Sequence, residues 1–221
     1  QTAAYQKVNN LIAIVDFNKI QTDKSVKDII DLGDLAKKFE VFGWHAQTCN
    51  GHDFAELENA FTRLKQVNDR PKVLIADTIK GKGVSFMEGP RALQDGNGLY
   101  PWHSGAPDDD TFEAGYREIV NRINARLEEL DLAPLETRVM ATREKNRATL
   151  KATAEKVVSA YGEALVKMGA QRKDIVVLDA DLSADCGLRP FEKAYPDRFI
   201  ENGIAEQDMV STAGGLALQG F

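Results

Sequence analysis

Cysteine is scarce in this sequence, with two residues, Cys49 and Cys186, in a chain of 221. Two cysteines so far apart form neither a disulfide framework nor a metal motif, because both need several cysteines at short spacings. We therefore expect both thiols to be reduced and structural. Thiols are kept reduced in the cytosol, so this composition favours a cytoplasmic location.

The sequence also lacks a long apolar run and an excess of positive charge. No segment approaches the roughly 18 consecutive apolar residues that suggest a membrane-spanning helix. The net charge is -6, from 28 Lys and Arg against 34 Asp and Glu. An acidic surface of this kind is repelled by phosphate-rich partners, so nucleic acid and anionic membrane are not expected as main partners.

What the chain does contain is enough hydrophobic residues, 43%, to fill a core. Residues 11–15 are a continuous apolar run, and residues 72–77 contain another between Lys72 and Asp77. Such runs are typical of strands buried on both faces of a parallel sheet. Another strand is predicted over 41–48. Helices are predicted over residues 31–39, 54–67 and 108–130, with Asp53 as the cap of the second. Strands and helices that alternate at these lengths predict an α/β fold with right-handed parallel crossovers.

The second half of the chain repeats the strand and helix patterns. We expect a helix over 151–169 that Gly169 ends, a strand over 174–183, and a small-residue helix over 207–220. Residues 134–150 have little apolar periodicity and are interpreted as a linker, so the predicted domains are 1–133 and 151–221. The polar, glycine-bearing stretch 89–101 predicts a mobile loop near a site entrance. Strand and helix patterns lie close to both ends, which favours a fragment of a longer protein.

Three places carry residues suited to chemistry. Glu206 follows a turn between a strand-like segment and a helix, where apolar neighbours could raise its pKa toward neutrality for proton transfer. Asn18 follows the first strand at the edge where open α/β sheets bind ligands. Lys80 and Lys82 alternate with glycines in a loop that could cradle a phosphate. Each has an ordinary alternative: a helix first-turn carboxylate, a turn-forming Asn, or a solvated loop.

Several stretches, in their order along the chain, resemble the transketolase family of thiamine-diphosphate enzymes, and its bacterial members above all. These stretches are Asn-Leu-Ile-Ala-Ile-Val-Asp-Phe-Asn-Lys-Ile (10–20), Lys-Gly-Lys-Gly-Val-Ser-Phe-Met-Glu (80–88), Pro-Trp-His-Ser-Gly-Ala-Pro (101–107), Val-Leu-Asp-Ala-Asp-Leu-Ser (177–183) and Gly-Ile-Ala-Glu-Gln (203–207). The resemblance covers nearly the whole chain. It implies a parallel-sheet thiamine-diphosphate-binding fold: the end of the diphosphate-binding domain, followed by the start of the pyrimidine-binding domain.

The resemblance also implies a role for each residue that matches a family motif. Thiamine diphosphate and Mg²⁺ are the implied cofactors. The side-chain oxygen of Asn18 and the backbone carbonyl of Ile20 would bind Mg²⁺, which prefers hard oxygen ligands. Glu206 would bond N1′ of the aminopyrimidine and drive ylid formation, and His103 would assist proton movement. Four further residues would lie near the cofactor: Lys80, Lys82, Asp181 and Leu182.

The implied function is transfer of a two-carbon ketol unit from a ketose donor to an aldose acceptor, among the sugars of the pentose phosphate pathway. The implied assembly is a homodimer, with each cofactor between the first domain of one subunit and the second domain of its partner. Two alternatives stay open. One is a carboligase similar to deoxyxylulose phosphate synthase. The other is an inactive fragment or assembly module, because the Gly-Asp-Gly half of the cofactor motif does not occur in the expected place.

The sequence departs from the family pattern at three positions. Ser104 is inserted in the family's His-Gly-Ala-Pro signature. Val158 stands where many members have an arginine, and Asp185 where a small hydroxyl residue is common. Both of the latter positions lie near the sugar-phosphate tail in the family. Loss of a cation and gain of an anion would weaken phosphate binding, which predicts an altered donor or acceptor, such as an unphosphorylated sugar.

Overall fold

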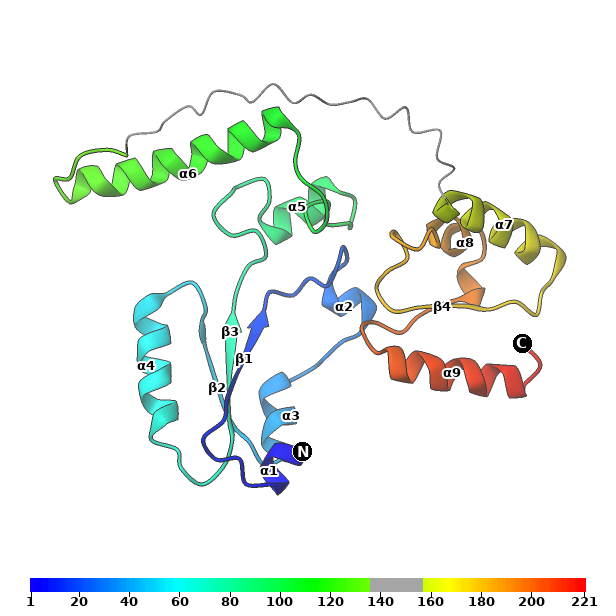
Figure 1. Cartoon of the computed structure of the whole chain (residues 1–221), viewed down its shortest axis with the longest axis horizontal. Helices are drawn as coiled ribbons and strands as arrows, with labels where there is room; N and C mark the ends of the chain where they lie inside the picture. Colours follow the sequence, from blue (N-terminus) through cyan, green and yellow to red (C-terminus); the bar gives the residue numbers. More distant parts are fainter. Residues whose placement is uncertain (136–156) are drawn as a thin grey trace. The chain divides into compact units, whose positions relative to one another are not determined.

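The computed structural model describes residues 1–135 and 157–221, which form two compact units, Gln1–Ile119 and Val120–Phe221 (Figure 1). The boundary between the units falls inside the long helix α6 (Asp109–Glu129). The predicted linker, 134–150, lies almost wholly outside the described residues. The domain limits at 133 and 151 therefore stay predictions.

The first unit is built on a three-stranded parallel sheet with the order β1-β3-β2 (Figure 1). Its strands are β1 (Ile12–Phe17), β2 (His45–Asn50) and β3 (Lys72–Asp77). In the register Phe17 pairs with Asp77, and Asn50 pairs with Asp77 from the other side. The carboxyl ends of all three strands therefore meet at one edge, and the predicted α/β class with a parallel sheet is confirmed.

The central strand β3 is buried, whereas the edge strand β1 is partly exposed. Val73 and Leu74 of β3 are fully buried, whereas Ile14 of β1 is 60% exposed. The prediction of burial on both faces is therefore right for β3 and wrong for β1 in this chain. The reason is position, because the sequences of the two strands are equally apolar but β1 lies at the edge of the sheet.

Helices of the first unit begin and end where capping residues dictate. Asp53 caps α4 (Phe54–Lys65), as predicted, by accepting hydrogen bonds from the N–H groups of Ala55 and Glu56. Helix α4 packs Ala60 and Leu64 against Leu74 and Cys49 of the sheet. The remaining short helices are α1 (Thr2–Tyr5), α2 (Val26–Ile29), α3 (Leu35–Val41) and α5 (Gly89–Asp95).

Two local predictions in this unit are wrong by several residues. The helix expected over 31–39 begins at Leu35, because Gly33 adopts a left-handed φ of 56° and the side chain of Asp34 caps the following turn. The strand expected over 41–48 begins at His45, because α3 continues through Val41. The apolar sequence of that stretch fits either structure, and the Asp34 cap favours the helix.

The stretch 89–101 is not an open loop, so that prediction is wrong. Its first half is helix α5, with Pro90 in the first turn, where the missing N–H costs nothing. Its second half ends at Tyr100, which is 4% exposed and packs with Ile20 and Ala92. The Tyr100 hydroxyl donates to the Met87 carbonyl at 2.9 Å. The polar composition of residues 89–101 suggests a loop, although the buried Tyr100 anchors this segment in the core.

The second unit contains a two-stranded parallel sheet, with the order β4-β5, and several helices (Figure 1). Besides the end of α6, its elements are α7 (Val157–Gln171), β4 (Val177–Asp179), α8 (Arg189–Ala194), the 3-10 turn η1 (Pro196–Arg198), β5 (Phe199–Glu201) and α9 (Glu206–Leu218). The strand expected over 174–183 is confirmed only for its centre. The first six residues of the helix expected from 151 lie outside the described part of the chain.

Gly169 does not end its helix, so the predicted C-cap is wrong. Helix α7 continues to Gln171, and Gly169 is buried inside it. A Cβ atom at this position would lie 2.7 Å from ring carbons of both Phe191 and Tyr195. Phe191 is the centre of the small core of this unit, together with Val177 and Leu188. Glycine is needed here for close packing and not for a turn.

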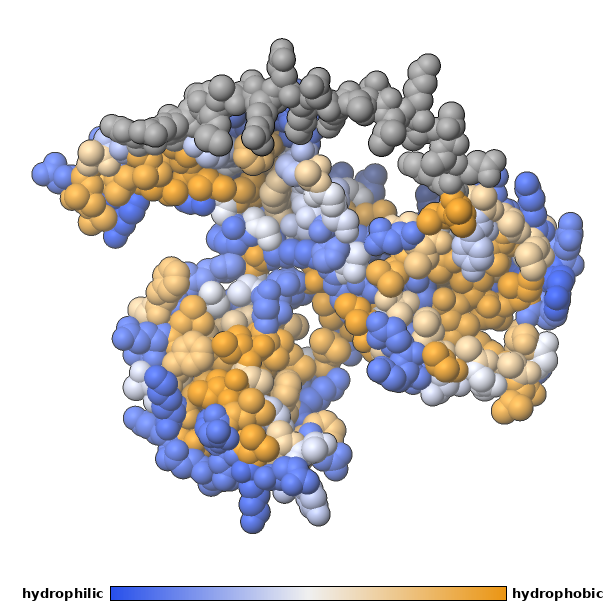
Figure 2. Space-filling view, in the orientation of Figure 1, coloured by the Kyte–Doolittle hydropathy of each residue, from blue (hydrophilic) through white to orange (hydrophobic). Residues whose placement is uncertain are grey.

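Hydrophobic side chains are exposed on both units, as the orange areas of Figure 2 show. Phe54 on α4 and Val210 and Leu218 on α9 are among the large exposed hydrophobic residues. Within the described residues, no helix is both long and apolar enough to cross a membrane. Neither cysteine forms a disulfide; Cys49 is buried and Cys186 exposed.

Candidate functional site

Asn18 organises the turn that follows β1. Its side-chain oxygen accepts a hydrogen bond from the Ile20 N–H at 3.0 Å, and its amide donates to the Asp16 carboxylate at 3.2 Å. Lys19 between them has a left-handed φ of 67°, and its ammonium donates to the Thr78 carbonyl at 2.7 Å and pairs with Asp77. These bonds tie the turn to the end of β3. The turn is therefore held at the carboxyl edge of the sheet, where α/β folds bind ligands.

This turn lines a cavity of about 380 Å³. The walls come from the turn itself, from the segment after β3 and from helix α5: Asn18, Lys19, Ile20, Ser25, Thr78, Ile79, Pro90 and Leu93. Ile20 is buried, and its side chain packs with Ala92 and Tyr100. The cavity is of the size that small-molecule sites occupy.

The oxygen atoms at this edge are of the chemical type that Mg²⁺ prefers as ligands. Asn18 offers an amide oxygen with one lone pair already used by Ile20, and Ile20 offers a backbone carbonyl. Mg²⁺ takes one or two protein ligands together with phosphate oxygens and water, so a pair of hard oxygens suits it. In the described part of the chain, no three His, Cys, Asp or Glu residues gather as a metal cluster. A cation here would therefore depend on phosphate oxygens for much of its shell.

The two predicted phosphate-loop lysines have protein partners. The Lys80 ammonium donates to the carbonyl oxygens of Gln21 and Thr22 and lies 2.9 Å from Nδ1 of His103. Lys82 forms an ion pair of 3.2 Å with Glu88. The structure thus brings Lys80 and His103 together. Gln21 and Thr22 directly follow Ile20, so this pair is linked to the turn that lines the cavity.

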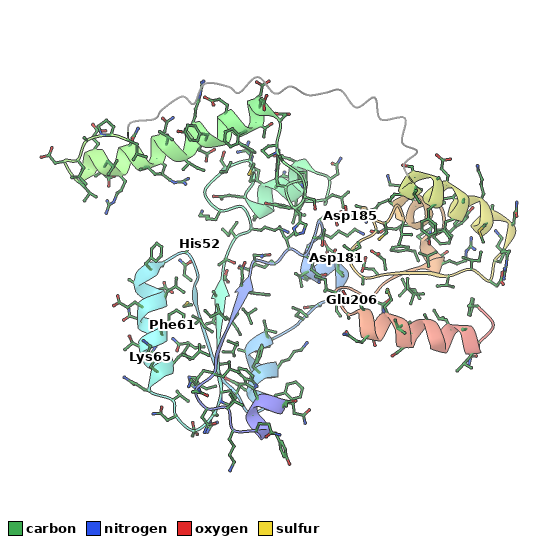
Figure 3. The ribbon with its side chains drawn as sticks, viewed as in Figure 1. His52, Phe61, Lys65, Asp181, Asp185 and Glu206 are labelled. Atoms are coloured by element: carbon green, nitrogen blue, oxygen red, sulfur yellow. The ribbon has the colours of Figure 1, made fainter. Side chains whose placement is uncertain are left out.

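His52 is exposed but has a defined contact. It lies in the loop after β2 (Figure 3), and its Nε2 accepts a hydrogen bond from the Ile79 N–H at 2.8 Å. Ile79 lines the cavity, and Lys80 follows it. Nothing in the local sequence marks this contact, because 27 residues separate its partners.

In the second unit, Asp181 and Leu182 occupy the turn after β4. Asp181 is 4% exposed and has a left-handed φ of 63°, which is unusual for a residue other than glycine. Its N–H donates to Glu201 Oε1 at 3.0 Å, and the Leu182 N–H donates to Asp179 Oδ2 at 3.0 Å. Leu182 itself is partly exposed. The carboxyl groups of Asp179, which is buried, and Glu201, which is half-buried, thus fix the shape of the turn.

Glu201, which sequence reasoning did not single out, links this turn to the one before α9. The same Oε1 atom that accepts from Asp181 also accepts the Gly203 N–H at 2.9 Å. Burial raises the pKa of the Glu201 carboxyl, and the nearby charge of Asp179 raises that pKa further. The amide hydrogen bonds from Gly203 and Asp181 oppose the shift. Only a contact between residues 20 positions apart could have revealed this role.

Glu206 is the first residue of α9, so the predicted place between a strand and a helix is correct. The expectation that apolar neighbours surround it is wrong for this chain by itself, because the side chain is exposed. The first turn of α9 is open and Val210 beyond it is 68% exposed. Figure 3 labels Glu206 together with Asp181 and Asp185 of the same unit. Asn18, Ile20, Lys80, Lys82 and His103 belong to the first unit and Asp181, Leu182 and Glu206 to the second.

Sequence comparison gives each half of the chain a counterpart. The family described as "Transketolase, thiamine diphosphate binding domain" matches residues 1–98, and "Transketolase, pyrimidine binding domain" matches residues 155–221. Asn18, Ile20, Lys80 and Lys82 fall in the first match, and Asp181, Leu182 and Glu206 in the second. His103 lies five residues beyond the first match.

Individual proteins agree with this assignment. The chain is 33% identical to human transketolase over 97% of its own length, and 31% identical to mouse transketolase-like protein 2 over 99%. It spans about a third of the length of these relatives, 33% and 34%. The solved transketolase of Campylobacter jejuni is 18% identical and covers 94% of this chain, with 36% of its own length matched and a TM-score of 0.38. The sequence matches, and not this score, assign the chain to a family.

Proposed function

Because the chain belongs to the transketolase family, we propose that it takes part in transfer of a two-carbon ketol unit between sugars, with thiamine diphosphate and Mg²⁺ as cofactors. One observation carries the proposal. The turn from Asn18 to Ile20 lines a cavity at the carboxyl edge of a parallel sheet, within the segment that matches the thiamine diphosphate binding domain. Thiamine diphosphate, when bound, supplies a ring that stabilises a carbanion.

The residues of the chain have separate tasks in this proposal. The oxygens of Asn18 and Ile20 hold the metal that neutralises the diphosphate. Asp181 and Leu182 present the turn after β4 to the cofactor, a turn that Asp179 and Glu201 keep in shape. Glu206 exchanges a proton at N1′ of the pyrimidine, which requires its carboxyl to be sheltered from water.

We further propose that this shelter comes from a second copy of the chain. Glu206 is exposed here, and hydrophobic residues of α9 such as Val210 are exposed beside it. In a homodimer the first unit of one chain would meet the second unit of the other. The scarcity of cysteine supports a cytoplasmic location for such an assembly.

Calorimetry with thiamine diphosphate and Mg²⁺ tests cofactor binding by the folded 221-residue chain. We expect micromolar affinity that depends on Mg²⁺. Asn18→Ala should lower the affinity by at least tenfold, since it removes a metal ligand. Asn68→Ala is the matched control, because Asn68 is an exposed asparagine that loses one hydrogen bond, to Gln66, far from the cavity.

Each outcome of the titration has a meaning. A folded chain that binds neither cofactor would contradict the enzymatic proposal for this chain and support an inactive or assembly role, which the match to transketolase-like protein 2 also permits. Equal loss in Asn18→Ala and Asn68→Ala would remove Asn18 from the site. If cofactor binds, release of carbon dioxide from pyruvate would favour the carboligase alternative over ketol transfer.

The substrate proposal concerns Val158 and Asp185. Val158 lies at the start of α7 with its carbonyl against Gly187, and Asp185 is an exposed carboxylate in the turn after β4 (Figure 3). An uncompensated carboxylate repels a phosphate, so we propose a donor or acceptor without phosphate. The test compares xylulose with xylulose 5-phosphate as donors for the active protein. An ordinary preference for the phosphorylated sugar would contradict this proposal.

A further inference from the structure

The ammonium group of Lys80 lies among three acceptors from two segments. Nζ donates to the carbonyl oxygens of Gln21 and Thr22, the second at 3.2 Å, and lies 2.9 Å from Nδ1 of His103. The ring of Tyr100, which is buried, has its centroid 4.8 Å from the same Nζ. A lysine ammonium has three N–H groups, so it can donate to several such acceptors at once.

This contact determines where the proton of His103 lies. Protonated lysine donates hydrogen bonds and cannot accept one, so Nδ1 of His103 must present its lone pair to Lys80. A neutral imidazole then carries its single proton on Nε2. Two carbonyl dipoles and an aromatic face around Nζ favour the charged form of the lysine, which makes the reverse arrangement, with a neutral Lys80 as acceptor, less stable.

His52 has the opposite arrangement in the same unit. Its Nε2 accepts the Ile79 N–H at 2.8 Å, so the lone pair is on Nε2 and the proton of the neutral ring is on Nδ1. His52 and His103 both contact the segment that follows β3, at neighbouring residues. The structure thus provides an internal reference: two histidines in one unit, held in different tautomers by different partners.

We propose that Lys80 is a positioning residue that fixes His103 in its Nε2–H tautomer, so that the imidazole meets a ligand oxygen as a hydrogen-bond donor. This differs from the role that the sequence suggested for Lys80, direct contact with a phosphate. It also gives His103 a defined chemical task, donation to an anionic or carbonyl oxygen. That task rests on the proposed function, whereas the tautomer and its dependence on Lys80 do not.

The test is nitrogen NMR of the cofactor-free chain labelled with ¹⁵N-histidine, at mildly alkaline pH where imidazoles are neutral. The sequence has three histidines, and His103→Asn and His52→Asn assign the signals of interest. We expect His103 to carry its proton on Nε2, with Nδ1 at the shift of a hydrogen-bonded acceptor, and His52 to carry its proton on Nδ1.

Substitutions at Lys80 then separate positioning from general structure. Lys80→Met keeps an apolar stem against Tyr100 but removes the donor, so the His103 Nδ1 signal should move to that of a water-facing nitrogen and an Nδ1–H population should appear. Lys80→Arg should restore the original signature. Lys82→Met is the matched control in the same loop; its partner is Glu88, so it should leave His103 unchanged. The His52 signals should not move in any of these variants, which would show that the loop remains folded.

Two results would overturn the proposal. One is a wild-type His103 with its proton on Nδ1, and the other is a His103 spectrum that Lys80→Met leaves unaltered. Because no cofactor is added, a negative calorimetric result on thiamine diphosphate has no bearing on this outcome. The positioning role and the proposed function therefore fail or stand separately.

Discussion

At the scale of single residues, the carboxyl group of Glu201 fixes the backbone of two turns through hydrogen bonds. Glu201 accepts N–H groups from Asp181 and Gly203 through one oxygen, and Asp179 beside it is 3% exposed. Burial and the neighbouring carboxylate raise the pKa of Glu201. Folding therefore favours the protonated form of the Glu201 carboxyl relative to the unfolded chain.

This arrangement predicts a pH dependence of stability. A carboxyl whose pKa is raised by folding contributes stability that is complete below its ordinary pKa and is lost as pH rises through the folded pKa. Glu201→Gln keeps an oxygen for both N–H groups and supplies a permanent donor to Asp179. Above pH about 4.3, the free energy of unfolding of the wild type should fall relative to that of this variant as the pH rises.

Chemical denaturation at a series of pH values measures this difference. Glu163→Gln on α7 is the control, because Glu163 is an exposed glutamate of the same unit. Its difference from the wild type should stay flat with pH. A flat difference for Glu201→Gln as well would mean that folding does not raise the pKa of the Glu201 carboxyl.

At the scale of elements, helices α7 and α8 pack closely against each other at a glycine of α7. Gly169 is buried in α7 against Phe191 and Tyr195 of the next helix region, and a Cβ would approach both rings to 2.7 Å. Gly214 in α9 is also helical, but a Cβ there would have no atom within 4 Å. The same substitution is therefore a test of packing at one site and of helix propensity alone at the other.

We expect Gly169→Ala to destabilise the chain by about 1–3 kcal/mol, the usual cost of overpacking a core, partly offset by a helix preference for alanine of about 1 kcal/mol. Gly214→Ala should instead stabilise it by up to about 1 kcal/mol. Denaturant midpoints at constant slope provide the comparison. Equal effects of the two variants would show that the α7–α8 contact is looser than its geometry indicates.

The same contrast explains what the sequence could predict about these elements. Strand β3 and helix α4 were found almost to the residue, because one is a continuous apolar run and the other has its own cap in Asp53. Gly169 was assigned to a turn because a glycine near a helix end looks the same whether it caps or packs. Helix α5 is not predicted from sequence because its anchor, Tyr100, lies five residues beyond its end and its own residues are mostly polar or small.

In the candidate site, the contacts that the sequence can anticipate are those within one turn. Asn18 and Ile20 are two residues apart and bond each other, so their motif is local. The bond from Lys80 to His103 spans 23 residues, and that from Ile79 to His52 spans 27. No periodicity or spacing encodes such pairs, because they arise only after the sheet has placed the ends of its strands together.

At the scale of the whole molecule, the proposed site divides between the two units. Asn18 and Ile20 belong to Gln1–Ile119, while Asp181 and Glu206 belong to Val120–Phe221. Glu206 is exposed, although the proton transfer proposed for it requires a site from which water is excluded. A homodimer in which each site takes Asn18 from one chain and Glu206 from the other would meet that requirement for both copies at once.

Mixing two inactive variants tests this arrangement. Asn18→Ala and Glu206→Gln should each abolish high-affinity binding of thiamine diphosphate when pure. If chains exchange, half of the dimers in an equal mixture contain one copy of each variant. Every such dimer has one site with both wild-type residues and one site with neither. We therefore expect the mixture to recover about a quarter of the wild-type sites.

Calorimetric stoichiometry measures the recovered fraction after the variants are mixed under conditions that allow chains to exchange. An equal mixture of Asn68→Ala with Glu163→Gln, both exposed and outside the proposed site, should bind at full stoichiometry. A monomeric chain, or a mixture that binds no better than its parents, would mean that Asn18 and Glu206 do not combine across chains. Glu206 would then need its shelter from elsewhere, since in a single chain the first turn of α9 leaves it open to water.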